Sequence, residues 1–323
     1  MKRVLSGIQP SGQLHIGNYF GMMSRMIQYQ KQNELYCFIV DYHALTTIND
    51  RKILETNTLN AAMDFLALGL DPDKSIFWIQ SDVPQVTELT WLLSTITGIG
   101  LLERATSYKD KTSRGISPNV GLFSYPILMA ADILCFGGDI VPVGKDQKQH
   151  LEMTRDIAQR FNKIYGDVFT IPDADINKTL QLIPGTDGQK MSKSYGNDIP
   201  IFADEKIIRK KIMSITTDST PIDEPKDKNA PLFQIFSLFL NEIEKRELES
   251  RFDNPGLRYG DVKKELADRI IDFFLPYREK REYLEKHKDY VLEVLEDGAQ
   301  KASHTADKYL RDARTAMGLN YAK

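Results

Sequence analysis

The sequence of 323 residues predicts an α/β fold in its first part and an all-helical fold in its last part. Short apolar segments alternate with longer amphipathic ones in the first half, and this alternation is typical of a parallel sheet with crossover helices. From about Ala203 onward the strand pattern disappears and only helical patterns follow. Because the chain exceeds the usual size of one domain, we expect two domains.

Four segments have the continuous apolar character of strands that are covered on both faces: residues 3–6, 36–40, 75–80 and 140–143. Apolar residues at helical spacing predict helices at residues 54–68, 88–96 and 151–161. We therefore expect a Rossmann-like parallel sheet, which binds ligands beyond the carboxyl ends of its strands.

Beyond residue 203, apolar residues at helical spacing continue to the end of the chain, interrupted by a polar, proline-containing connector at residues 223–231. Residues 261–323 contain 13 basic and 13 acidic side chains, so their composition indicates no basic face. The whole chain has a net charge of -3. Any nucleic-acid partner must therefore be held by local patches of charge.

The two cysteines, Cys37 and Cys135, lie in apolar stretches and have no metal-ligand spacing. We expect them to be buried thiols of a reducing compartment. No apolar run approaches the length of a membrane span, and the apolar residues at the N-terminus are too few for a signal peptide. The expectation is a soluble, cytoplasmic protein without a membrane partner.

The string Lys-Met-Ser-Lys-Ser at residues 190–194, referred to below as the KMSKS segment, is the strongest functional signal. It follows Gly185 and Gly188 and precedes Gly196, which predicts an exposed loop. Two lysines in one loop can reach different oxygens of a triphosphate, and the hydroxyls and backbone amides add neutral donors. A solvated charged loop without a ligand is the alternative interpretation.

A second signal follows the first predicted strand, where residues 7–12 read Gly-Ile-Gln-Pro-Ser-Gly and residues 14–18 read Leu-His-Ile-Gly-Asn. A strand, a glycine-rich turn and a helix start are typical of a phosphate site, because a helix N-terminus offers unpaired amides. The pattern is neither GxGxxG nor a P-loop, which argues against a nicotinamide dehydrogenase and an ordinary kinase. On its own, the Pro-Ser-Gly turn could be simple chain reversal.

Together, these two motifs resemble in order and separation the paired signatures of class I aminoacyl-tRNA synthetases. Residues 125–134 and 139–150 resemble the tryptophanyl branch of that family, and the resemblance covers essentially the whole chain. One position departs from the commoner motif, because Asn18 stands where His is usual. Asparagine is frequent there in this branch and can still donate a hydrogen bond through its amide.

The resemblance implies that ATP, with Mg²⁺, and L-tryptophan form tryptophanyl-adenylate, which then acylates tRNA(Trp). It implies a Rossmann-like catalytic domain at residues 1–195, which would include the KMSKS segment and a helical dimerisation insertion around residues 84–140. Residues 196–323 would form a helical domain that binds the tRNA anticodon, and the protein would be a homodimer.

The resemblance also assigns residues to the two substrates. The catalytic residues would be Lys190, Lys193, Asn18 and Lys111. The residues on the ATP side would be Gln9, Pro10, Ser11, Gly17, Asn18, Gly144, Lys145, Asp146, Ile183, Lys190, Met191, Ser192, Lys193 and Ser194. The residues on the tryptophan side would be Gly7, His43, Tyr125, Met129, Asp132, Val141, Val143 and Gln147. No general base is required, because the attacking carboxylate is already ionised at neutral pH.

Asp132 is the residue that we expect to determine amino acid specificity. An indole ring has one polar atom, a donor, so its pocket needs one acceptor in otherwise apolar walls. A ligand without that donor would leave a buried carboxylate unpaired, and such a site can reject analogues strongly.

Structural explanations remain open for several of these residues. Asp132 and Asp146 could be helix caps, Tyr125 and Met129 could be core residues, His43 could lie in a plain loop, and Lys111 could lie in a surface loop. Three other functions also remain open: a tyrosine-specific relative, a small nucleotidyltransferase, and a non-catalytic RNA-binding relative. A tyrosine pocket must satisfy a hydroxyl that both donates and accepts, so a single carboxylate suits indole better.

Overall fold

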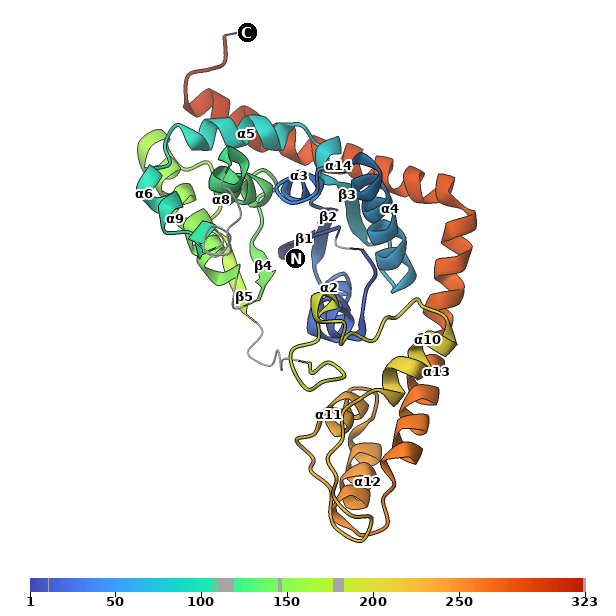
Figure 1. Cartoon of the computed structure of the whole chain (residues 1–323). Helices are drawn as coiled ribbons and strands as arrows, with labels where there is room; N and C mark the ends of the chain where they lie inside the picture. Colours follow the sequence, from blue (N-terminus) through green and yellow to red (C-terminus); the bar gives the residue numbers. More distant parts are fainter. Residues whose placement is uncertain (11, 107, 110–118, 145–146, 177–182, 322–323) are drawn as a thin grey trace.

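The computed structural model describes residues 1–10, 12–106, 108–109, 119–144, 147–176 and 183–321 (Figure 1). In these residues five parallel strands form one sheet in the order β3-β2-β1-β4-β5. The strands are β1 (Arg3–Ile8), β2 (Glu34–Ile39), β3 (Ser75–Ile79), β4 (Ile140–Val143) and β5 (Asp173–Ile176). The order is that of a doubly wound, Rossmann-like sheet, and the winding direction reverses between β1 and β4.

The four predicted strands are confirmed as β1 to β4, with ends that differ by up to two residues. The edge strand β5 is not predicted by the sequence, because its Asp-Ala-Asp-Ile sequence lacks the apolar run of a buried strand. Its Asp175 carboxylate accepts two hydrogen bonds from Arg25 at 2.7 and 2.8 Å. The positive charge of Arg25 partly neutralises Asp175. A prediction from apolar patterns alone does not place such a carboxylate in a strand.

Helices connect the strands and follow the predicted pattern. The predicted helices at residues 54–68, 88–96 and 151–161 are confirmed as α4, α5 and α9, although α4 and α5 end one and two residues earlier than predicted. The α-helices in this part are α1 (Ile16–Asn18), α2 (Ser24–Tyr29), α3 (Asp41–Ala44), α4 (Arg51–Ala67), α5 (Gln85–Ser94), α6 (Ile99–Glu103), α8 (Val120–Leu134) and α9 (Lys148–Tyr165). Short turns of other helix types in the described residues include η1 (Tyr19–Met23), η2 (Gln80–Asp82) and η4 (Lys193–Tyr195).

The described residues after 203 contain helices and no strand, as expected. They are α10 (Glu205–Met213), α11 (Pro231–Ser237), α12 (Glu242–Asp253), α13 (Tyr259–Lys286) and α14 (Lys288–Ala316). Figure 1 shows α11 and α12 at the end of the molecule opposite α5. The helix α14 runs back along β3 toward α5. The predicted polar connector precedes α11, which starts at Pro231, a residue suited to the first turn of a helix.

The two faces of the sheet contribute to two different apolar cores, because successive side chains of a strand point to opposite faces. Val4, Cys37 and Phe77 point into one core, which extends through α4 to the helices α10 to α13. Leu5 and Trp78 point into the other core, together with α5, α8, α9 and α14. The C-terminal helices therefore cover both faces of the sheet.

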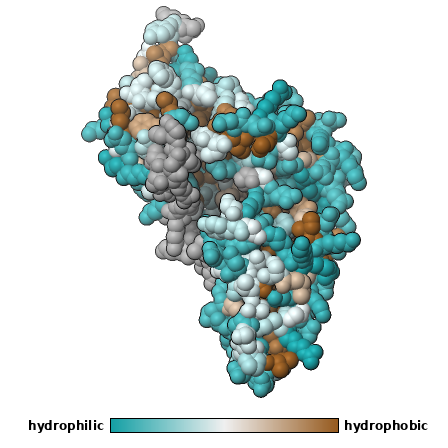
Figure 2. Space-filling model, viewed as in Figure 1, coloured by the Kyte–Doolittle hydropathy of each residue, from teal (hydrophilic) through white to brown (hydrophobic). Residues whose placement is uncertain are grey.

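The molecular face in Figure 2 is largely hydrophilic, with apolar side chains gathered in small, separate groups. Among the described residues, no helix combines the length and apolar character that crossing a membrane requires.

Close packing of α14 on β3 leads to a test of the fold. A Cβ on Gly298 would lie 1.9 Å from the backbone oxygen of Phe77, so Gly298→Ala must push α14 away from the sheet. We expect a loss of about 1–3 kcal/mol in the free energy of unfolding, measured as a lower Tm. The control is Gly260→Ala in α13, where a Cβ meets no atom within 4 Å and alanine favours the helix. Equal Tm values for both variants would contradict the packing.

Candidate active site

The carboxyl ends of β1 and β4 meet where the winding of the sheet reverses, which is the usual ligand position in this fold. Gly7 lies in the central strand β1, yet it is exposed. A Cβ at this position would lie 2.8 Å from Cγ1 of Val40 and 3.6 Å from the Phe38 ring. Gly7 thus exposes backbone at the surface of the sheet, and a larger side chain there would displace Val40.

The turn after β1 combines a glycine of unusual backbone conformation with a short helix start. Gly12 has a φ of +80°, which other residues rarely adopt. The Asn18 side-chain oxygen accepts a hydrogen bond from the backbone N–H of His15 at 3.1 Å, so Asn18 fixes the start of α1. The Asn18 amide group keeps its NH₂ donors. Gln9 is exposed and Pro10 is buried, whereas Ser11 lies outside the described residues.

His15 lies at the centre of this turn and is buried. Its pKa is lowered to about 4, mainly by burial; the charge of Asp198 opposes this shift and that of Lys193 adds to it. The imidazole is therefore neutral at neutral pH.

The KMSKS segment begins in the second arm of a hairpin, in which the backbone N–H of Met191 donates to the oxygen of Ile183 at 3.0 Å. Ile183 and Met191 are both buried in the first core. Asn197, also buried, accepts from the backbone N–H of Ser192 at 2.7 Å and donates to the oxygen of Lys190 at 3.1 Å. Asn197 thus fixes the backbone on both sides of Met191.

The structure brings the KMSKS segment and the first turn together. The backbone N–H of Ile16 donates to Ile199, and that of Ile201 donates to Leu14, both at 3.0 Å. A Cβ on Gly17 would lie 3.3 Å from Cβ of Met191, and a Cβ on Gly12 would lie 3.8 Å from Nζ of Lys193. Lys193 is half-buried at this contact, whereas Lys190 and Ser194 are exposed.

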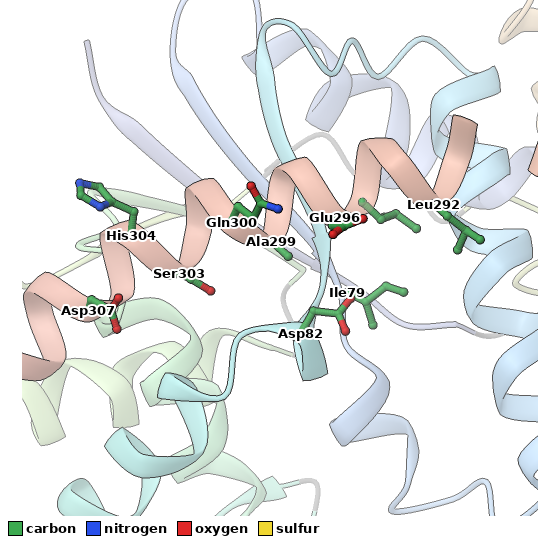
Figure 3. Close-up of a pocket in the computed structure, with 10 residues that line it drawn as sticks. Ile79, Asp82, Leu292, Glu296, Ala299, Gln300, Ser303, His304 and Asp307 are labelled. Atoms are coloured by element: carbon green, nitrogen blue, oxygen red, sulfur yellow. The ribbon is translucent and has the colours of Figure 1, made fainter. Parts of the chain in front are cut away.

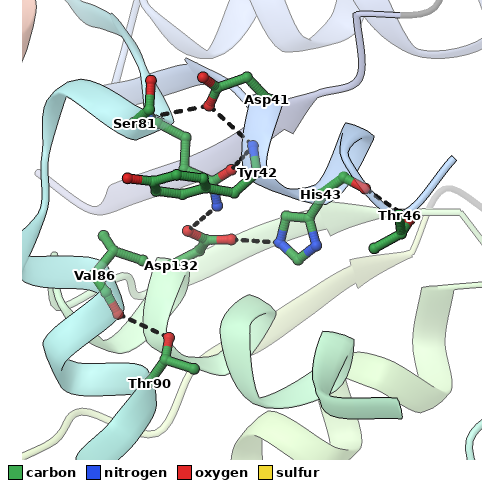
Figure 4. A network of polar contacts seen from close by, with 9 residues as sticks. Asp41, Tyr42, His43, Thr46, Ser81, Val86, Thr90 and Asp132 are labelled. Atoms are coloured by element: carbon green, nitrogen blue, oxygen red, sulfur yellow. Dashed lines mark hydrogen bonds and ion pairs between the residues drawn. The ribbon is translucent and has the colours of Figure 1, made fainter. Parts of the chain in front are cut away.

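Asp132 of α8 is buried in a hydrogen-bonded network with residues that follow the strands β2 and β3 (Figure 4). His43 Nε2 lies 2.8 Å from one carboxylate oxygen, and Gln80 Nε2 donates to the other at 2.6 Å. The Gln80 side-chain oxygen in turn accepts from the backbone N–H of Tyr42 at 3.1 Å. Burial raises the pKa of Asp132, and the hydrogen bonds from His43 and Gln80 act in the opposite direction.

This network excludes two of the structural explanations. Asp132 lies near the C-terminal end of α8, so it does not cap the N-terminus of its helix. His43 is buried and contacts a carboxylate, so it is not a plain loop residue.

Other residues assigned to the amino acid side also lie near one another. Met129, Val141 and Val143 belong to one small apolar cluster. The Tyr125 ring packs edge-to-face against His43, with ring centroids 4.5 Å apart. Gln147 precedes α9, and its backbone N–H donates to Gly144 at 3.0 Å. Packing thus brings these residues together around the ends of α8 and β4. Lys111, Lys145 and Asp146 lie outside the described residues.

Two residues that organise this site, Gln80 and Asn197, belong to none of the sequence motifs. Gln80 stands at the carboxyl end of a predicted strand, and this position was the available signal. Asn197 follows the KMSKS segment after a glycine, and no pattern in the sequence distinguishes it from an ordinary turn residue.

A separate pocket of about 690 Å³ lies between α14 and the end of β3 (Figure 3). Its walls carry three carboxylates, from Asp82, Glu296 and Asp307. Negative charge of this density disfavours a triphosphate. The pocket is therefore not the nucleotide site indicated by the two motifs.

Comparison with known proteins shows the family to which the chain belongs. Residues 1–275 match the model of tRNA synthetases class I (W and Y). The chain is 52% identical to a tryptophan–tRNA ligase of Fusobacterium nucleatum, and the match covers 99% of this chain and 98% of that protein. It also matches the crystal structure of tryptophanyl-tRNA synthetase from Campylobacter jejuni complexed with ADP and tryptophan, with a TM-score of 0.93 and 49% identity. That match covers 98% of this chain and all of the other chain.

A tyrosyl-tRNA synthetase from Archaeoglobus fulgidus has the same fold, with a TM-score of 0.67 at 21% identity. The greater identity and coverage lie with the tryptophan-specific proteins. The chain belongs to the class I tRNA synthetases of the tryptophan and tyrosine group and, within this group, to the tryptophanyl-tRNA synthetase family.

Proposed function

We propose that the protein is a tryptophan–tRNA ligase, which activates L-tryptophan with ATP and transfers it to tRNA(Trp). The observation that carries this function is the closure of the KMSKS segment on the first turn, at the carboxyl end of β1. The tryptophan–tRNA ligases at 49 to 52% identity over almost the whole chain support the same function.

Asp132 is the proposed acceptor for the indole N–H. A carboxylate offers about four lone-pair positions, and His43 and Gln80 occupy one on each oxygen, so a position for a third donor remains. These two partners also fix the direction of the carboxylate. Met129, Val141 and Val143 supply apolar surface beside it, and the exposed backbone of Gly7 allows a ring to approach the sheet closely.

The lysines of the KMSKS segment and the turn after β1 are the proposed ATP site. The amino acid carboxylate attacks the α-phosphate in line, and negative charge moves onto the departing pyrophosphate. Lys190 and Lys193 stabilise this charge most in the transition state, and Asn18 donates from the opposite side of the site. Mg²⁺ enters as part of the nucleotide substrate. Gln9, Gly17 and Ile183 are also proposed to lie at the nucleotide, as are the other residues that the resemblance assigns to ATP.

We propose residues 1–195 as the catalytic domain and residues 196–323 as the domain that binds the tRNA anticodon. Exposed apolar side chains on α5, α6 and α8, namely Trp91, Ile99 and Val120, support dimerisation through the region around residues 84–140. A homodimer would cover this surface. A cytoplasmic location follows from the proposed tRNA substrate.

Exchange of labelled pyrophosphate into ATP tests the proposed function. The protein should catalyse exchange with tryptophan and show little with tyrosine, because one buried carboxylate suits an indole donor better than a hydroxyl that also accepts. Exchange with tyrosine and none with tryptophan would contradict the proposed specificity.

Asp132→Asn tests the indole acceptor. The variant keeps the size of the side chain but loses one acceptor oxygen, and a hydrogen bond to a charged group is worth about 1.5–3 kcal/mol. The KM for tryptophan should rise by about 10- to 100-fold, with a much smaller change in the KM for ATP. The control is Asp139→Asn, because the Asp139 side chain accepts a hydrogen bond from the backbone N–H of Arg3 at the amino end of β1. A similar rise in both KM values would indicate a structural role for Asp132.

Lys193→Ala tests the phosphate site. The rate of adenylate formation should fall by about 10²- to 10³-fold, with a smaller effect on ATP binding in the ground state. Rapid-quench measurement of adenylate formation gives this rate directly. Lys206→Ala, at an exposed position of α10, is the matched control. An unchanged rate in Lys193→Ala would refute the assigned role.

A further inference from the structure

A buried ion pair joins α4 of the sheet region to α13 of the C-terminal helices. Arg281 Nε donates to Asp64 at 2.6 Å, and Arg281 Nη2 donates to the side-chain oxygen of Asn60 at 2.9 Å. Asp64 is 4% exposed and Arg281 is 9% exposed. Glu285, one turn further along α13, also lies 3.3 Å from Arg281. The guanidinium is therefore held by groups from both helices.

The packing of α4 against α13 does not by itself require the ion pair between Asp64 and Arg281. Ala61 and Phe65 of α4 and Phe274 and Leu284 of α13 belong to the same apolar core, so apolar side chains already pack these helices together. Removing two charges from water costs several kcal/mol per ion, and apolar replacements of similar volume are often as stable. A role beyond packing would explain why charged groups occupy this position.

The polar face of α4 that carries Asp64 continues toward Lys193. Asn57, Asn60 and Asp64 are three and four residues apart, so they lie on one face of the helix. The side-chain oxygen of Asn57 lies 3.7 Å from the point that a Cβ of Gly12 would occupy, and Lys193 Nζ lies 3.8 Å from the same point. The ammonium group of Lys193 therefore lies beside the polar face of α4.

The charges of Lys193 and Asp64 influence each other's pKa. Burial lowers the pKa of Lys193, while the carboxylates of Asp198 and Asp64 raise it. Burial likewise raises the pKa of Asp64 to about 6, against the opposing charges of Arg281 and Lys193. Asp64 is thus paired with Arg281 of α13, and its charge also acts on Lys193, which lies beside the Asn57 end of the same helix face.

We propose that Asp64 is a positioning residue for Lys193, and that Arg281 holds the Asp64 carboxylate in the direction that attracts this lysine. The inference rests on the proposed function, because it assigns Asp64 to the step in which Lys193 acts on the phosphates. In this arrangement α4 links the C-terminal helices to the KMSKS segment. Asp64 itself need not contact a substrate.

Two variants separate positioning from stability. Asp64→Asn leaves Arg281 as a buried, less compensated cation, so it should lower both the Tm and the rate of adenylate formation. The rate should fall by about 10- to 100-fold, as expected for a displaced catalytic group, with little change in the KM for tryptophan. Asp64→Asn combined with Arg281→Met removes both charges and should restore the Tm, while the rate stays low. Recovery of the rate together with the Tm would overturn the proposal.

A double-mutant cycle with Lys193→Ala provides the decisive comparison. If Asp64 acts through Lys193, Asp64→Asn should cost no further rate in the Lys193→Ala background. An equal loss in both backgrounds would show that Asp64 acts independently of Lys193 and would overturn the proposal. Asp268→Asn is the control, because it breaks an exposed ion pair of α13 with Arg209 of α10. The rate of this control should not change.

The same assays distinguish failure of this inference from failure of the proposed function. Tryptophan-dependent pyrophosphate exchange by the unchanged protein is the reference for every variant. Absence of this exchange in the unchanged protein would refute the proposed function and the inference with it. Normal exchange in the unchanged protein, with additive effects of Asp64→Asn and Lys193→Ala, would refute the inference alone.

Discussion

The contact between the first βα turn and the chain around residues 190–201 is the constraint on which the site depends. Two backbone hydrogen bonds, Ile16 to Ile199 and Ile201 to Leu14, join segments that are far apart in the sequence. Gly17 permits this contact, because a side chain there would press on His15 and Met191. Without this closure the lysines of the KMSKS segment would have no fixed relation to the strand ends.

The second organising feature is the hydrogen-bonded carboxylate of Asp132. It comes from α8, whereas its partners His43 and Gln80 come from the chain after β2 and β3. A carboxylate that is buried without partners is costly, so the network both stabilises Asp132 and fixes its direction. The parallel sheet thereby places an oriented acceptor close to the ends of the same strands that carry the nucleotide motifs.

Much of the fold follows from local patterns in the sequence, and the remainder depends on distant partners. The apolar runs of β1 to β4 predict these strands, whereas β5 is acidic and depends on Arg25 of α2. Motifs identified the first turn, the KMSKS segment and Asp132 as candidates. The contribution of Asn197 depends on backbone atoms on both sides of Met191, and that of Asp64 depends on Arg281 of α13. Hydrophobic periodicity contains no information on such pairs.

The central claim is that one nucleotide contacts both the turn after β1 and the KMSKS segment, beside the Asp132 acceptor. A crystal structure with tryptophan and a non-hydrolysable ATP analogue tests this claim most directly. We expect phosphate oxygens within hydrogen-bond distance of Lys193 Nζ and near residues 12–18, with the indole N–H donating to Asp132. A nucleotide bound elsewhere, or an indole nitrogen directed away from Asp132, would contradict it.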